Sequence, residues 1–106
     1  MADLLILEFD GFGEETYEKV NKALGIDMDT GEGDWPPGLL THAAGAHAGG
    51  WRVVEVWASQ ADQEAFMRSR LGEALQKGGA ADKPPSRVEW TPLRAHHHPK
   101  QKASAG

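Results

Sequence analysis

The order of the predicted elements indicates a small α+β domain of β-α-β-β-α-β type, the ferredoxin-like arrangement of a four-stranded antiparallel sheet with two helices on one face. Three observations predict it. Residues 4–9 form an apolar run without helical period, residues 14–24 carry apolar side chains at helical spacing, and residues 39–58 read as a hairpin with a glycine turn. The 106-residue length suits one domain, which we place at residues 1–95, followed by a flexible polar tail at 96–106.

The first predicted helix follows directly from local signals. It begins at Glu14, since acidic side chains in the first turn interact favourably with the helix dipole. Tyr17, Val20 and Leu24 recur at the spacing of one buried stripe. Gly25 is a plausible C-cap, because glycine adopts the left-handed conformation in which many helices end.

The second half of the chain predicts a hairpin, a helix and a last strand. Small residues dominate the strand at 39–46, and the turn at 48–50 leads into the strand at 51–58, which is rich in Trp and Val. A helix with Ser as its N-cap runs over 59–76, weakened at an internal glycine. A strand at 87–93 completes the sheet.

This order of elements also predicts a homodimer. Right-handed crossovers place both helices on one face of the sheet, so the other face is left bare. The strands at 4–7 and 53–54 are nevertheless apolar on both sides, instead of alternating apolar and polar residues. A second copy of the chain would cover the bare face. The alternative is a monomer whose C-terminal tail folds back over it.

Composition excludes several classes of function. The net charge of -5 argues against nucleic acid as a partner, because phosphate binding needs clustered Lys and Arg. The absence of cysteine excludes disulfides, thiolate metal sites and a cysteine nucleophile, and it fits a cytoplasmic protein. No apolar run approaches the ~18 residues of a membrane span, and we expect neither a membrane partner nor a signal peptide.

Three segments carry a family resemblance: GLLTHAAG at 38–45, GGWRVVEVW at 49–57 and FMRSRLGEAL at 66–75. They resemble small actinobacterial proteins of the dimeric α/β-barrel superfamily, relatives of the antibiotic-biosynthesis monooxygenases. The resemblance implies a pocket between sheet and helices in each subunit. It also implies a cofactor-independent enzyme for an aromatic or polyketide-like metabolite, either a monooxygenase or a cyclase/isomerase. The alternative is a non-catalytic small-molecule-binding or stress-associated dimeric protein.

The resemblance suggests functional residues by type. Haem-degrading members ligate iron with a His on the second helix, and residues 60–77 contain none, so we expect no haem. Cyclase-type members pair a His with a Tyr, for which His42 and Tyr17 are the analogue. Quinone-forming monooxygenases use Asn, Trp, Tyr and Arg, and the side chains that would serve here are Asn21, Trp51, Trp57, Tyr17 and Arg52.

His42 and Glu55 are the predicted catalytic residues. His42 stands among small residues that leave room for a ligand, and an imidazole is the natural acid/base near neutral pH. Glu55 lies in a strand that should be central, as does Glu8, and a buried carboxylate needs a partner. If both carboxylates point into the pocket, their pKa values should separate and one can act as a base. The alternatives are a structural histidine and salt bridges from the carboxylates to Arg52, Arg87 or a partner subunit.

Four aromatic residues are the predicted substrate contacts. Strand alternation puts Trp51 and Trp57 on one face with Glu55, where the indoles suit a flat ligand or equally fill a core or interface. Tyr17 would add a wall from the first helix. Trp35 would anchor a mobile lid formed by the Asp- and Gly-rich loop at 27–37, which might otherwise be a plain solvated loop.

Two metal motifs are weak. The acidic segment at 27–34 resembles a calcium loop but has Glu32 where glycine is required and Gly38 at the bidentate Glu position. Three adjacent histidines at 96–98 form no preorganised site. We therefore predict no metal and no cofactor.

Overall fold

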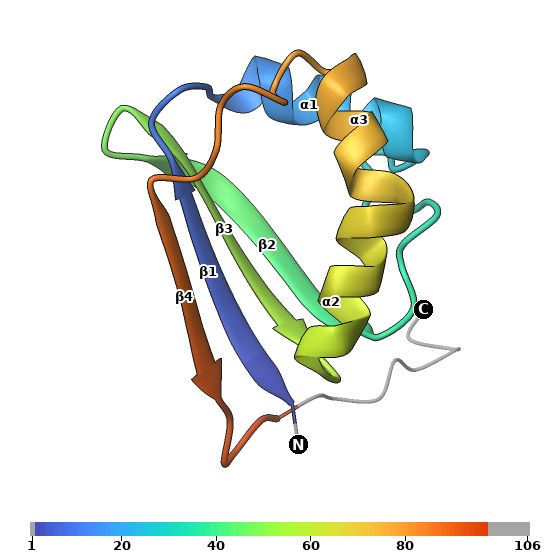
Figure 1. Ribbon diagram of the computed structural model, residues 1–106, viewed down its shortest axis with the longest axis vertical. Coiled ribbons are helices and arrows are strands. Elements are labelled where there is room, and N and C mark those ends of the chain that lie inside the picture. Colours follow the sequence, from blue (N-terminus) through green and yellow to red (C-terminus); the bar gives the residue numbers. More distant parts are fainter. Residues whose placement is uncertain (1, 98–106) are drawn as a thin grey trace.

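The computed structural model describes residues 2–97 and contains one sheet with helices on one of its faces (Figure 1). The predicted element order is confirmed. The chain runs through these elements: β1 (Asp3–Phe9), α1 (Glu14–Leu24), β2 (Leu39–His47), β3 (Gly50–Trp57), α2 (Gln60–Phe66), the π-helical segment η1 (Met67–Leu71), α3 (Gly72–Lys77) and β4 (Arg87–Pro92).

The four strands lie in the order β2-β3-β1-β4, and every neighbouring pair is antiparallel. The fold class predicted from the sequence, ferredoxin-like α+β, is therefore confirmed. β1 and β3 are the central strands, since each has a neighbour on both sides. They carry the most deeply buried side chains of the core, Leu5 and Trp57.

The helix ends follow the predicted chemistry. Gly25 ends α1 in the left-handed conformation, with φ of 82°. Ser59 caps α2, and its hydroxyl accepts a hydrogen bond from the backbone N–H of Asp62. The predicted single helix over 59–76 is instead interrupted by η1, which ends just before Gly72. An inserted π turn shifts the face that the following residues present, and such turns often occur near functional sites.

The β2–β3 hairpin closes through a two-residue turn at Ala48 and Gly49. Both residues have positive φ, 51° and 83°. Two-residue turns of this kind match the right-handed twist of the strands they join, and for that reason they are favoured in hairpins. The turn sets the register that pairs His47 with Gly50 and, further along, His42 with Glu55.

All the helices lie over the same face of the sheet, so the opposite face, here called the open face, carries no helix (Figure 1). Strand alternation puts Leu4 and Ile6 of β1 on the open face beside Val54 of β3, which pairs with Ile6. The predicted strand that is apolar on both faces is thus present. The predicted polar tail from residue 98 lies outside the described residues. Within residues 2–97 no helix is long and apolar enough to cross a membrane.

Candidate functional site

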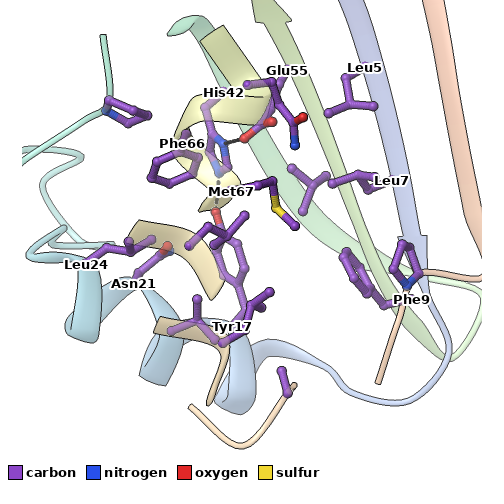
Figure 2. A pocket seen from close by; sticks show the side chains of 18 of the residues that line it. Leu5, Leu7, Phe9, Tyr17, Asn21, Leu24, His42, Glu55, Phe66 and Met67 are labelled. Carbon is purple, nitrogen blue, oxygen red and sulfur yellow. Dashed lines mark hydrogen bonds and ion pairs between the residues drawn. The ribbon is translucent and has the colours of Figure 1, made fainter. Parts of the chain in front are cut away.

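A cavity of about 440 Å³ lies between the sheet and the helices, within the range of small-molecule sites. Its walls are mainly apolar and come from β1, β3, β4 and the helices, as Figure 2 shows for Leu5, Leu7 and Phe9 on β1 and for Leu24 on α1. Val88 of β4 lines the cavity and is 55% exposed, and Met67 of η1 is 39% exposed. This main cavity therefore opens to solvent between β4 and η1.

Four side chains form a hydrogen-bonded chain at one wall of the main cavity. The hydroxyl of Tyr17 is hydrogen-bonded to Nε2 of His42, and Nδ1 of His42 lies 2.8 Å from Oε2 of Glu55 (Figure 2). The indole N–H of Trp57 donates to Oε1 of Glu55 at 2.9 Å. The Glu55 side chain is only 10% exposed and that of His42 only 16%. Each polar group of this buried chain thus has a partner, as burial requires.

The chain of hydrogen bonds assigns a tautomer to the histidine. A carboxylate accepts and cannot donate, so the proton on His42 belongs on Nδ1, facing Glu55. Nε2 then carries the lone pair and accepts the hydroxyl proton of Tyr17. The arrangement leaves a basic nitrogen and a phenol in contact at the edge of an apolar space.

Local structure explains why these residues meet. Strand register places His42 of β2 directly opposite Glu55 of β3, so their side chains lie on the same face. Trp57 follows two residues after Glu55 on that face. Tyr17 reaches the pair from α1, where it lies one turn from Asn21, and both side chains line the cavity. The site therefore draws on three elements that are distant in sequence.

The environment raises the pKa of Tyr17 above its ordinary value of 10.0. The largest cause is burial, which disfavours the charged phenolate, and the negative charge of Glu55 adds to it. A hydrogen bond with the side chain of Asn21 opposes the shift. Tyr17 accordingly stays protonated and is a proton donor at neutral pH.

A second hollow of about 500 Å³ adjoins the main cavity, between α1, the 26–35 loop and β2. Five residues line both spaces: Tyr17, Asn21, Ile26, Trp35 and His42. The rings of Tyr17 and His42 are nearly coplanar, with an interplanar angle of 8°, and they are joined end to end by their hydrogen bond. These two side chains thus form part of the wall between the main cavity and the second hollow.

The loop before β2 holds Trp35 against this wall. The Trp35 and His42 ring centroids are 5.1 Å apart, and the Trp35 indole N–H donates to the carbonyl of Gly31 at 2.8 Å. The guanidinium of Arg70, in η1, donates to the carbonyls of Leu24 and Asp34 at 2.9 and 2.6 Å. Trp35 is thus at the site, as predicted, and the mobility of the lid stays a prediction.

The two central carboxylates do not share the pocket. Glu55 faces the helices, whereas Glu8 pairs in register with Arg52 and lies on the open face. There its Oε2 accepts from Arg52 at 2.6 Å and from Arg87 at 2.9 Å, which lowers the pKa of Glu8. The idea of two coupled pocket carboxylates is therefore wrong, and the salt-bridge alternative describes Glu8. The partner of Glu55 is His42.

The two tryptophans of β3 differ from their predicted role as walls of one pocket. Trp57 is fully buried in the core, stacks near Phe66 and lines neither space. Its function at the site is to hold Glu55. Trp51 lines the second hollow, with its ring 5.0 Å from that of Tyr17, and does not line the main cavity.

Two contributors were missed by sequence reasoning as members of one site. Asn21 is 5% exposed and lines both spaces, and its position four residues after Tyr17 was the available signal. Arg70 had no local signal, because its partners are backbone carbonyls more than 30 residues away.

The acidic loop serves its own backbone. Oδ1 of Asp27 accepts the backbone N–H groups of Asp29 and Thr30 at 2.8 and 3.2 Å, the pattern of an Asx turn. Among the residues that the structure describes, no group of three or more His, Cys, Asp or Glu side chains is placed to hold a metal ion. Of the predicted histidine tail motif, His98 lies outside the described residues.

Comparison with solved structures identifies the fold. The chain matches the crystal structure of a proposed antibiotic biosynthesis monooxygenase from Chloroflexus aurantiacus J-10-fl with a TM-score of 0.62 and 14% identity, covering 93% of this chain and 100% of that one. The chain shares this fold. A second match is a proposed antibiotic biosynthesis monooxygenase from Bacteriodes thetaiotaomicron VPI-5482, with a TM-score of 0.49, 19% identity and coverage of 96% and 94%. No family model and no curated protein matches the chain.

The first of these matches confirms the fold expected from the sequence resemblance. At 14% identity it speaks for the fold and not for the reaction. The argument for function therefore rests on the site.

Proposed function

We propose that the chain is an acid/base enzyme that works without a resident cofactor on an aromatic or polyketide-like metabolite. The observation that carries the proposal is the chain Tyr17–His42–Glu55 at the wall of an apolar cavity. An apolar cavity with a few convergent polar groups is the usual form of a small-molecule site. The printed names of the two similar structures agree with this general kind of activity.

His42 is the proposed base. Glu55 fixes the ring through Nδ1 and stabilises the imidazolium that forms when Nε2 takes a proton. Tyr17 is the proposed acid: it gives its hydroxyl proton to one oxygen of the ligand, or passes it to Nε2 and takes a proton from the ligand in exchange. A C–H bond next to a ligand carbonyl is the bond that such a pair can break, giving an enolate and a protonated His42.

Two outcomes follow from the enolate. In a cyclase or isomerase, the enolate carbon attacks a second carbonyl of the ligand or regains its proton at another carbon, and no external oxidant is used. In a monooxygenase, the enolate gives its electrons to dioxygen. Both outcomes share the proton-transfer step, which is the step that the residues of this chain support.

Proton exchange tests that step directly. In D₂O, the exchange of the C–H protons beside the carbonyl of 2-tetralone can be followed by proton NMR with and without protein. We expect the wild type to accelerate exchange and H42A to lose about 100-fold or more of the acceleration. His47 supplies the matched control, because it lies on the same strand near Glu8 and Arg52 on the open face, so H47A should exchange as the wild type does.

The outcomes separate an enzyme from a binding protein. Equal acceleration by H42A and wild type would refute the role of His42. Binding of 2-tetralone by the wild type without any accelerated exchange would refute the enzyme and favour the non-catalytic binding protein.

We propose further that two copies of the chain pair through the open face. Support comes from the apolar side chains of Leu4, Ile6 and Val54, which no helix covers. Sedimentation equilibrium should give twice the chain mass for the wild type and the single-chain mass for I6K, because a buried unpaired charge at the seam is costly. A23K, on the exposed side of α1, is the control and should stay dimeric. A monomeric wild type would refute the dimer.

A further inference from the structure

The second hollow contains a polar atom that has no partner within the part of the chain that the structure describes. Nε1 of Trp51 is out of contact with solvent and makes no hydrogen bond, and the whole residue is 5% exposed. A buried N–H that has lost water without gaining another acceptor destabilises the fold. Such groups are rare and commonly mark a binding function or a bound water.

The surroundings of Trp51 leave room for an acceptor. Its ring borders the hollow beside Tyr17, with the centroids 5.0 Å apart. Ala46 pairs with Trp51 in the β2–β3 ladder, and Ala44 lies two residues away on the same face. Both alanines are exposed and line the hollow, because the neighbouring strand offers only methyl groups there.

We propose that the second hollow is a subsite that takes a neutral oxygen of the ligand, a carbonyl or phenolic oxygen, hydrogen-bonded to Nε1–H of Trp51. The inference rests on the proposed function in one respect: the apolar body of the same ligand occupies the main cavity. Tyr17 and His42 meet in a single hydrogen bond at the boundary of the two spaces, so a turn of either side chain joins them.

Charge selects the type of oxygen. The carboxylates of Glu14 and Asp27 come from two different elements that line the hollow, so an anionic ligand group would be repelled. A cation would be repelled by the positive end of the indole N–H bond. A neutral oxygen avoids both penalties, and it satisfies the donor.

The test uses two probes of the same shape, fluorene and 9-fluorenone, which differ in one carbonyl oxygen. Isothermal titration gives the two affinities, and the indole N–H peak of Trp51 in a ¹H–¹⁵N spectrum, assigned by its loss in W51F, reports the site. We expect 9-fluorenone to bind about five- to tenfold more tightly than fluorene, the worth of one hydrogen bond, and to move the Trp51 peak downfield.

Two variants remove the preference by different routes. W51F keeps a ring but loses the donor, and A44L keeps Trp51 but fills the hollow. In both we expect the two probes to bind within about twofold of each other, with the affinity for fluorene unchanged. A44L keeps the test valid if W51F does not fold.

Each other outcome overturns the subsite and is distinguishable from failure of the proposed function. Equal wild-type affinities and a fixed Trp51 peak mean that the donor is met by water or a neighbouring ring, while the apolar cavity stands. A preference that survives W51F and A44L but is lost in Y17F places the oxygen on Tyr17. If neither probe binds the wild type, the ligand class of the proposed function fails, and the subsite fails with it.

Discussion

The indole of Trp57 should hold the candidate base in place, and its removal has a predictable cost. Its N–H donates to Oε1 of Glu55 at 2.9 Å, and the ring is fully buried. In W57F the carboxylate oxygen loses its donor while the Glu55 side chain, 10% exposed, gains little water in exchange. A hydrogen bond to a charged group contributes about 1.5–3 kcal/mol.

The smaller ring adds a second cost. Phenylalanine leaves part of the indole volume empty, which removes about 1 kcal/mol through the lost contacts of the cavity lining. W57F should therefore lower the free energy of unfolding by about 3 kcal/mol, as measured by urea denaturation at pH 7. W90F is the matched control, because Trp90 is only partly buried at the cavity wall; its loss should stay near 1 kcal/mol.

A double-mutant cycle separates the hydrogen bond from the packing. W57F and E55M each leave one member of the bond without its partner, whereas the double variant leaves neither, so the two losses should fall short of additivity by about 1.5–3 kcal/mol. Additivity within about 0.5 kcal/mol would refute the conclusion that Trp57 holds Glu55.

Two further predictions concern single residues. Tyr17 is the only tyrosine of the chain, so absorbance near 295 nm reports its ionisation alone: its midpoint should lie above 10, and E55Q should bring it down. Because the folded pKa is the higher one, the stability held by the protonated phenol is complete below pH ~10 and is lost as the pH rises through the folded value; a midpoint at the free-tyrosine value would contradict this. Ala48 has a φ of 51°, and A48G should raise the free energy of unfolding by about 0.5–1 kcal/mol in urea; no gain would show that the turn carries no strain.

Much of the fold was legible because its signals are local. The Ser59 cap, the Gly25 terminus and the glycine turn each depend on residues within a few positions of one another. The helix over 59–76 was wrong in one detail, the π turn of η1. That turn has no local signature of its own, since tertiary contacts decide where an extra residue is accommodated.

The site was legible only in part. Strand alternation correctly grouped Glu55 with Trp51 and Trp57 on one face, since the side-chain period of a strand is fixed at two. It could not assign Glu8 and Glu55 to their faces relative to the helices. The two faces of a strand are equivalent until the crossovers place helices on one of them, and that choice is made by long-range packing.

The sequence by itself determined the order of the elements, the apolar character of both sheet faces and the residue types that can move a proton. The tertiary structure alone decided which of them meet. Tyr17 contacts His42, 25 residues away, because α1 packs over β2, and the hairpin register brings His42 to Glu55. Hydrogen bonds reach only about 3 Å, so a chain of them exists only where the packing of separate elements fixes each donor and acceptor.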